Sequence, residues 1–278
     1  MSAHTAVRTS TVRGELSFLH VIRSEWIKLR TLRSTVWTLS SVFVVLVGFS
    51  LLISATLPDA ATVKTYSPIG STELNMFVTS SATSAIMFAN LIIGVLGVLV
   101  ISGEFSTGMI RSSFAAEPRR FPVLAAKGIV LSVTSFVVGL VSLTLCWTIT
   151  VGLLAPKGYD AHFFASSTLW SILGGSTALA LIALFALGVG TIVRSTAGSI
   201  ATVVGVLFVL PIIGSIVVSL FPQQKWIATV SHYLLDETAR SMAGGTTSLQ
   251  PWQNVLTVVI WAAVSFILGA LLLQRRDA

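Results

Sequence analysis

The residue types that could do chemistry in this chain are few, and the first is a glycine–serine triplet, Gly174, Gly175 and Ser176. A serine nucleophile at such a site needs a general base within hydrogen-bond reach. All four histidines lie outside the long apolar runs of the chain: His4, His20, His162 and His232. We therefore interpret Ser176 as a small residue that permits close helix packing, and not as a nucleophile.

Other hydrolytic, metal and nucleotide-binding motifs are absent from the sequence. There is no HExxH, no aspartate lies in an apolar run, and the single Cys146 cannot form an intrachain disulfide or a cysteine zinc site. The chain also lacks GxxxxGK followed by Ser or Thr, so it has no P-loop for ATP. We expect no catalytic residue, metal site or cofactor here, and any uphill transport must draw its energy from another subunit.

Asn90 is the most conspicuous polar side chain inside an apolar run. A buried asparagine of this kind either forms a hydrogen bond between helices or contacts a transported substrate, and we favour the first interpretation. A transporter driven by a proton or sodium gradient would need a site for the coupling ion. The sequence offers no such site beyond Asn90, so we rank this class third.

The composition indicates a membrane protein. The chain is 54% hydrophobic and 10% charged, against about 45–50% and about 25% in soluble domains. Six runs without Asp, Glu, Lys, Arg or His are long enough to cross about 30 Å of hydrocarbon as helices: residues 36–57, 80–102, 128–153, 168–193, 195–220 and 252–273. This pattern predicts an all-α polytopic membrane protein.

The runs divide the chain into a polar arm of residues 1–35, a transmembrane domain of residues 36–273 and a tail of residues 274–278. The first run follows a long arm and exceeds the h-region of a signal peptide, so we expect it to remain in the mature chain. Only the segment around Arg194 separates the fourth and fifth runs, which predicts a helical hairpin there.

The positive charges are distributed unequally between the two sides of the predicted bundle. Thirteen of the seventeen Lys and Arg residues fall on the side that carries both termini: Arg8, Arg13, Arg23, Lys28, Arg30, Arg33, Arg111, Arg119, Arg120, Lys127, Arg194, Arg275 and Arg276. We therefore expect both termini in the cytoplasm. The net charge of +7 then reflects topology and attraction to anionic lipid, and does not indicate nucleic-acid binding.

An amphipathic helix is predicted just before the first run. Its apolar residues recur at spacings of three and four: Phe18, Leu19, Ile22, Trp26 and Leu29. Such a helix lies in the plane of the membrane interface, with its cations near anionic lipid. It is either a plain membrane anchor or an elbow against which another protein packs.

Two connections are long enough to have structure of their own. Residues 103–122 predict a short helix that ends before Pro118, in which the apolar Phe105 and Met109 would either dock a partner or fold back on the membrane. On the opposite side, residues 221–251 predict a helix from Trp226 to Met242. That helix is part of an inserted hairpin, an external cap or a solvated loop.

Three of these segments together resemble the membrane subunits of ABC-2 type exporters, in particular the six-span permeases of actinobacterial type. The segments are SEWIKLRTLRSTVWTL from Ser24 to Leu39, ISGEFSTGMIRSSFAAEPRR from Ile101 to Arg120, and LGVGTIVRSTAGSIA from Leu187 to Ala201. The resemblance implies an elbow helix before the first span. It also implies a coupling helix between spans two and three, which seats in a separate ATP-binding cassette subunit.

The resemblance assigns roles to individual residues. The coupling residues that it implies are Glu104, Phe105, Gly108, Met109, Ile110 and Arg111, and the elbow residues are Glu25, Trp26, Lys28, Leu29 and Arg30. Glu104 is expected to favour the positive N-terminus of the coupling helix, and Arg111 to meet an acidic rim. ATP and Mg²⁺ would bind to the partner ATPase, so this chain is not expected to be an enzyme.

The function that the resemblance implies is ATP-driven export through the plasma membrane, along a pathway between two permease copies. A homodimer is preferred to a heterodimer, and apolar spans favour a hydrophobic or amphiphilic cargo such as a drug, a lipid or an antimicrobial peptide. The outer segment departs from the family pattern, because Tyr233 and Leu234 are followed by Leu235 and Asp236 and not by proline. The alternative function is a membrane-embedded sensor or scaffold without transport.

Overall fold

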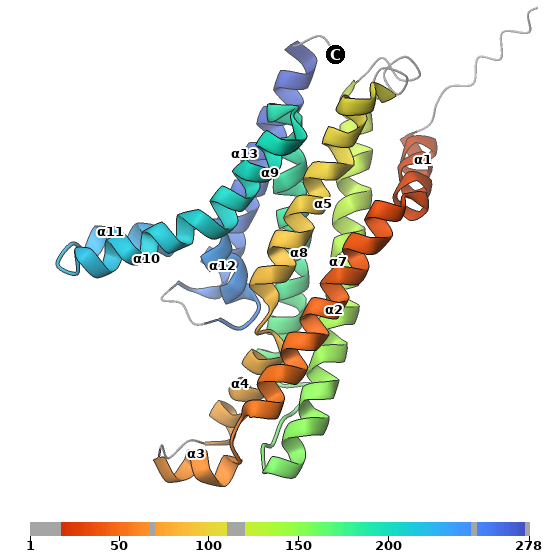
Figure 1. Ribbon diagram of the computed structural model, residues 1–278. Helices are drawn as coiled ribbons and strands as arrows, with labels where there is room; N and C mark the ends of the chain where they lie inside the picture. The colour runs from red at the N-terminus through yellow and green to blue at the C-terminus, as the bar shows by residue number, and fades with distance from the viewer. Residues whose placement is uncertain (1–17, 67–69, 110–119, 246–248, 276–278) are drawn as a thin grey trace, which may run out of the picture.

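The computed structural model describes residues 18–66, 70–109, 120–245 and 249–275, and in these ranges the regular structure is entirely helical (Figure 1). Six helical segments are long and apolar enough to cross a membrane: Arg33–Thr56, Glu73–Thr107, Arg120–Lys157, Ser166–Val193, Thr196–Leu220 and Pro251–Arg275. The six predicted runs are thereby confirmed, with the second and third longer than expected.

Helix α8 (Ser166–Val193) lies at the centre of the bundle, against α5 (Ile86–Thr107), α7 (Arg120–Leu154) and α13 (Pro251–Arg275). Glycines allow this close packing. A Cβ on Gly188 would lie 2.5 Å from the backbone of Ser265 in α13, and one on Gly97 of α5 would lie 2.7 Å from the carbonyl oxygen of Ala183 in α8. Ser176 is fully buried and donates a hydrogen bond to its own helix, which fits its interpretation as a packing residue.

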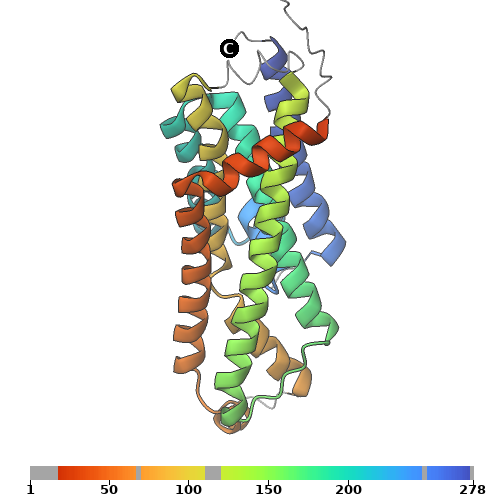
Figure 2. The same cartoon turned by 90° about the vertical axis from the view of Figure 1, so that its right-hand side faces the viewer.

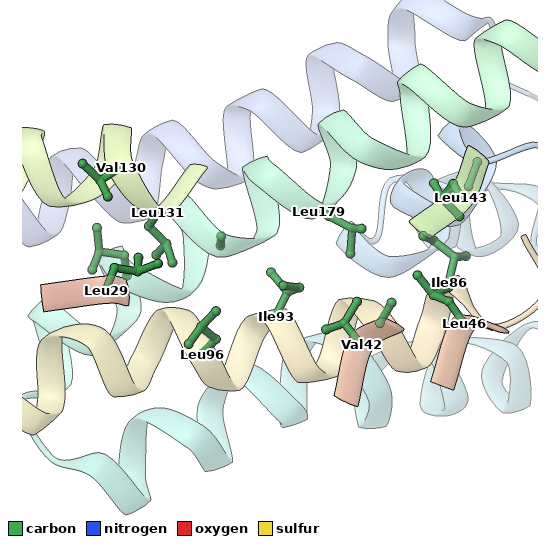
Figure 3. Packing of buried hydrophobic residues seen from close by; sticks show 14 of the residues in the cluster. Leu29, Val42, Leu46, Ile86, Ile93, Leu96, Val130, Leu131, Leu143 and Leu179 are labelled. Carbon is green, nitrogen blue, oxygen red and sulfur yellow. The ribbon is translucent and has the colours of Figure 1, made fainter. Parts of the chain in front are cut away.

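The main hydrophobic core runs along the bundle where α2 (Arg33–Thr56) packs on α5 and α7 (Figure 3). Val42 and Leu46 of α2 face Ile86 and Ile93 of α5, and Leu143 of α7 lies at the same level as Ile86. At the other end of this core Leu29 joins α1 to it.

Two of the six spans are interrupted. The second consists of α4 (Ser71–Ala82) and α5, separated by residues 83–85. The fifth begins as α9 (Thr196–Val204), passes through a π-helical turn, η2 (Gly205–Val209), and continues as α10 (Leu210–Leu220). Helix α10 leans away from the bundle and buries none of its residues (Figure 1). The shorter α3 (Ala60–Tyr66) and η1 (Ala155–Lys157) lie at the end of the bundle opposite α1.

The single helix predicted from Trp226 to Met242 is wrong, because the segment forms two helices, α11 (Lys225–Ser231) and α12 (Leu235–Met242). Leu234 has an extended backbone and precedes α12, and the carbonyl of Tyr233 accepts a hydrogen bond from Trp261 of α13. This break turns α12 inward, where six of its eight residues are buried against α8 and α13. The segment is therefore not a solvated loop.

A helix is present where one was predicted before the first span, as α1 (Phe18–Thr31). Figure 2 shows α1 crossing α7 near one end of the bundle. The last turn of α13 lies at the same end, as an even number of spans requires (Figure 1). Glu25 and Leu29 face the bundle and are buried, whereas Leu19 and Trp26 are exposed.

Candidate functional site

Four charged side chains meet where α1 crosses the bundle, and we call them the charge ring: Glu25, Lys28, Glu104 and Lys127. The Lys127 Nζ lies 2.5 Å from Glu25 Oε2 and 2.9 Å from Glu104 Oε1. The Lys28 Nζ lies 2.7 Å from Glu25 Oε1 and 3.2 Å from Glu104 Oε1. Each carboxylate is thus bonded to both ammonium groups.

The ring joins three helices that are distant in sequence. Glu25 and Lys28 are one turn apart on α1, Glu104 lies in the last turn of α5, and Lys127 lies near the start of α7. Glu25, Glu104 and Lys127 are buried, and Lys28 is partly exposed. Because isolated charges are costly to bury, these groups hold one another in place, and removing any one leaves the others uncompensated.

The environment of the ring shifts the pKa values of its two α1 members. Burial raises the pKa of Glu25, but the positive charges and hydrogen bonds of Lys127 and Lys28 outweigh burial, so the pKa lies below its usual value. Burial lowers the pKa of Lys28, yet its bonds and attraction to Glu25 and Glu104 raise it overall. Both groups are therefore held in their charged forms at neutral pH.

The structure places Glu104 differently from our expectation. We expected it at the start of a separate coupling helix, but it lies in the last turn of α5, because that helix continues to Thr107 and ends at Gly108 with a left-handed backbone (φ 70°). Met109 follows and is 43% exposed. Ile110 and Arg111, and the rest of the predicted coupling helix, lie outside the described residues.

Phe105, another predicted coupling residue, connects the end of α5 to the turn between α8 and α9. The Arg194 guanidinium lies 5.3 Å from the centre of the Phe105 ring, within the range of a cation–π contact. Arg194 ends α8 with a left-handed backbone (φ 60°), and Ser195 caps α9, which forms the predicted hairpin. Four predicted coupling residues are thus gathered at one end of the bundle: Glu104, Phe105, Gly108 and Met109.

The five predicted elbow residues fall on two faces of α1. Glu25 and Leu29 face the bundle, in the charge ring and in the hydrophobic core, with Lys28 at the edge of the ring. Trp26 and Arg30 face outward and are exposed. We expected Glu25 at a contact with a partner, but within this chain the Glu25 carboxylate faces Lys127 of α7.

Sequence reasoning missed Lys127, which it counted only as one of many positive charges on the side of the termini. Its neighbours Ala125, Ala126 and Gly128 are small or apolar, and a lysine in such surroundings at the start of a span either extends to the membrane interface or pairs with a carboxylate. Glu104 at the end of the preceding span is the natural candidate. These two positions allow a pair between neighbouring spans, but they do not indicate that Glu25 and Lys28 of α1 join it.

A second buried polar contact involves Asn90. Its Nδ2 donates to Asp236 Oδ1 at 3.3 Å, and Asp236 Oδ2 lies 2.9 Å from Arg240 Nε. Asn90 and Asp236 are both buried. The partner of Asn90 is therefore on α12, a segment for which the sequence left an inserted hairpin, an external cap and a solvated loop open. The spacing of Leu235, Ala239 and Met242 was the available signal, because it marks one buried face of a helix.

The described residues contain no group of three or more His, Cys, Asp and Glu side chains that could hold a metal ion.

Comparison with known protein families identifies a family for this chain. A family model described as ABC-2 family transporter protein matches residues 19–278, which is nearly the whole chain and includes all six spans. A search of curated proteins finds no match. Members of this family are membrane permeases that generally work with an ATP-binding subunit. The chain belongs to the ABC-2 transporter family, and is a membrane permease with six candidate spanning helices.

Proposed function

We propose that this permease forms the translocation pathway of an ATP-driven exporter and is coupled to a separate ATP-binding cassette subunit. Helix α1 acts as the elbow helix, and the connection that begins at Gly108 contains the coupling helix. The chain does not hydrolyse ATP, and ATP and Mg²⁺ bind to the partner.

The observation that carries this proposal is the charge ring. Glu104 lies four residues before Gly108, and Lys127 lies on the helix that follows the same connection. Glu104 is bonded to Lys28 of α1, and Lys127 is bonded to Glu25 of the same helix. A displacement of residues 108–119 by a partner would therefore move α1 together with the ends of α5 and α7, as one rigid unit.

The distribution of charge supports a cytoplasmic location for this end of the bundle. In the sequence, thirteen of the seventeen basic residues belong to segments on the side predicted to carry both termini, and Lys/Arg enrichment marks cytoplasmic segments. The exposed Trp26 and Arg30 of α1 suit the interface of the plasma membrane, where the aromatic ring enters the headgroup region and the cation contacts anionic lipid.

Helix α10, in the least buried of the six spans, offers a surface for contact with a second copy of the chain. The apolar helix α10 leans out from the bundle and buries none of its residues within the chain. We propose a homodimer in which the pathway runs between the copies. Because the spanning helices carry few polar groups, the cargo is hydrophobic or amphiphilic, as a drug, a lipid or an antimicrobial peptide would be.

The test is gentle purification of the tagged full-length chain from its native membrane, with identification of bound proteins by mass spectrometry and a measurement of ATPase activity. Exporter function predicts an ATP-binding cassette subunit in stoichiometric amount. A chain that is recovered alone and without ATPase activity would contradict the proposal and favour a sensor or scaffold.

A further inference from the structure

A cavity of about 230 Å³ lies where the second span is interrupted, between residues 80–86 and the second half of α12. Most of the side chains that line it are polar: Ser80, Thr83, Ser84, Glu237, Arg240 and Ser241. A water molecule takes up about 30 Å³, whereas sites for whole drug-sized ligands start at about 300 Å³. The cavity therefore has the size of a polar head group.

The cavity and the charge ring lie at opposite ends of α5. Ile86 begins α5 and belongs to the cavity wall, and Glu104 of the ring follows it by eighteen residues. At 1.5 Å per residue this separation is about 27 Å, close to the roughly 30 Å thickness of the hydrocarbon core. With the ring at one membrane interface, the cavity lies at the other, which is the outer one in the proposed topology.

Three exposed groups of the wall can accept hydrogen bonds from a ligand. Glu237 Oε2 accepts from Arg240, while Glu237 Oε1 has no partner in the described part of the chain, and this side chain is 31% exposed. Ser80 donates its hydroxyl hydrogen to the Phe77 carbonyl, so its oxygen is left as an acceptor. Ser84 makes no hydrogen bond through its hydroxyl within the described residues. Both serines are exposed.

The charges around the cavity favour a cation. Glu237 and the buried Asp236 carry two negative charges, and Arg240, which is paired with both, carries one positive charge. Arg240 is the only basic side chain among the described residues of the wall, so a net charge of −1 remains. A primary ammonium group supplies one positive charge and three N–H donors, which match this charge and the three acceptors.

An exposed apolar surface adjoins the cavity along α5. Phe88 in the first turn of α5 is 38% exposed, and its ring lies 4.9 Å from that of Phe49 in α2. An alkyl chain that extends from the cavity along α5 would lie against these rings. The ligand that suits both parts is an amphiphile with a cationic head.

We propose that this cavity binds the primary ammonium group of an amphiphilic amine, which donates to Glu237 Oε1 and to the hydroxyl oxygens of Ser80 and Ser84. The site belongs to the permease alone. That the bound amine is a cargo rests on the proposed export function, and narrows the cargo to cationic amphiphiles. Binding is tested without the ATPase, so it can fail while the co-purification test of export succeeds, and the reverse.

Photolabelling tests the proposal on the full-length chain in phosphatidylcholine nanodiscs. The probe is dodecylamine with a diazirine in its alkyl chain, and matched probes carry a trimethylammonium or a hydroxyl group in place of the ammonium. We expect dodecylamine to label peptides containing residues 80–88 and 237–245 about tenfold more than the other two, because only the ammonium has both the charge and the N–H donors. Equal labelling by the trimethylammonium probe would show that charge alone accounts for binding, and would overturn the proposal.

Competition distinguishes two sources of the ammonium group. Dioleoylphosphatidylethanolamine that blocks labelling at a lower membrane concentration than unlabelled dodecylamine identifies a lipid head group, and the reverse order identifies a free amphiphilic amine. Both results support the site, whereas labelling that neither compound reduces contradicts it.

Two variants connect the labelling to the cavity, each with a matched control. Glu237→Gln should lower dodecylamine labelling about tenfold, while Asp160→Asn, which removes an equal charge from a side chain that is 67% exposed, should not. Ser84→Trp fills the cavity and should abolish labelling, while Ser106→Trp at the other end of α5 should not. An unchanged unfolding midpoint shows that each variant is folded. Full labelling of folded Glu237→Gln or Ser84→Trp would place the amine elsewhere and refute the assignment.

Discussion

Lys127 and Glu25 lie 102 residues apart in the sequence, yet their side chains form a buried ion pair of 2.5 Å that fixes α1 to α7. The pair is part of a ring in which every charge is compensated. In a buried ion pair, removing one charged partner destabilises the protein more than removing both, because the remaining charge is left buried and uncompensated. We expect the same of this ring.

Lys127→Leu should destabilise the protein by about 3–5 kcal/mol, because two buried carboxylates then share only Lys28. The double variant Glu25→Leu with Lys127→Leu leaves a balanced pair, Lys28 and Glu104, and should cost less than the sum of its single variants. The measurement is the thermal unfolding midpoint of each variant in detergent. Glu237→Ala at the more exposed pair with Arg240 is the control, with an expected cost of about 0–1 kcal/mol. Strict additivity of Glu25→Leu and Lys127→Leu would show that the two charges are not coupled.

The pH dependence of stability should follow the direction of the Glu25 pKa shift. The pKa of Glu25 is lowered in the folded protein from its usual 4.5, so its contribution is complete above that value and is lost as the pH falls through the lowered pKa. For Lys28 the pKa is raised, so its contribution is complete below 10.5 and is lost as the pH rises through the raised pKa. Unfolding midpoints measured from pH 8 down to pH 3 should show a smaller decline in Glu25→Gln than in the wild type. Parallel profiles would argue against the salt-bridged state of Glu25.

Asp236 should stabilise α12 mainly as a hydrogen-bond acceptor for Asn90. Asp236→Ala leaves the buried Asn90 Nδ2 without an acceptor and should cost about 1–3 kcal/mol. Asp236→Asn retains an acceptor oxygen for Asn90. It releases the Arg240 side chain, but that side chain is 39% exposed and can be hydrated, so this variant should lose clearly less stability than Asp236→Ala. Thermal unfolding and protease cleavage between α11 and α12 measure both effects. Equal losses in the two variants would show that charge, and not the bond to Asn90, holds α12.

The contact between α8 and α13 should tolerate no side chain at Gly188. A Cβ there would lie 2.5–2.7 Å from backbone atoms of Ser265 and Phe266, so Gly188→Ala should cost about 1–3 kcal/mol by forcing the helices apart. Gly152→Ala meets nothing within 4 Å and should be neutral or slightly stabilising, because alanine favours helix. Unfolding midpoints distinguish the two substitutions. A neutral Gly188→Ala would mean that the helices pack less closely than described.

The six spans and α1 were predictable from sequence because their signals are local. Exclusion of charge marks a membrane span, and a spacing of three and four residues marks an amphipathic helix. The charge ring was not predicted, because its members are brought together by helices that are distant along the chain. The position of Asp236 was left open for another reason: the sequence predicted one helix from Trp226 to Met242, and the break at residues 232–234 that turns α12 inward involves a contact with Trp261 of α13.

The most direct test of the coupling account is the double variant Met109→Asp with Ile110→Asp. It places two charges on the apolar surface proposed to seat in the ATP-binding subunit, while Phe164→Asp, exposed at the opposite end of the bundle, is the control. The measurement is the amount of ATP-binding subunit that co-purifies with each tagged chain from native membranes, at equal levels of inserted permease. The account predicts that the wild type and Phe164→Asp retain this subunit and that the double variant loses it. Retention of the subunit in full by the double variant would contradict it.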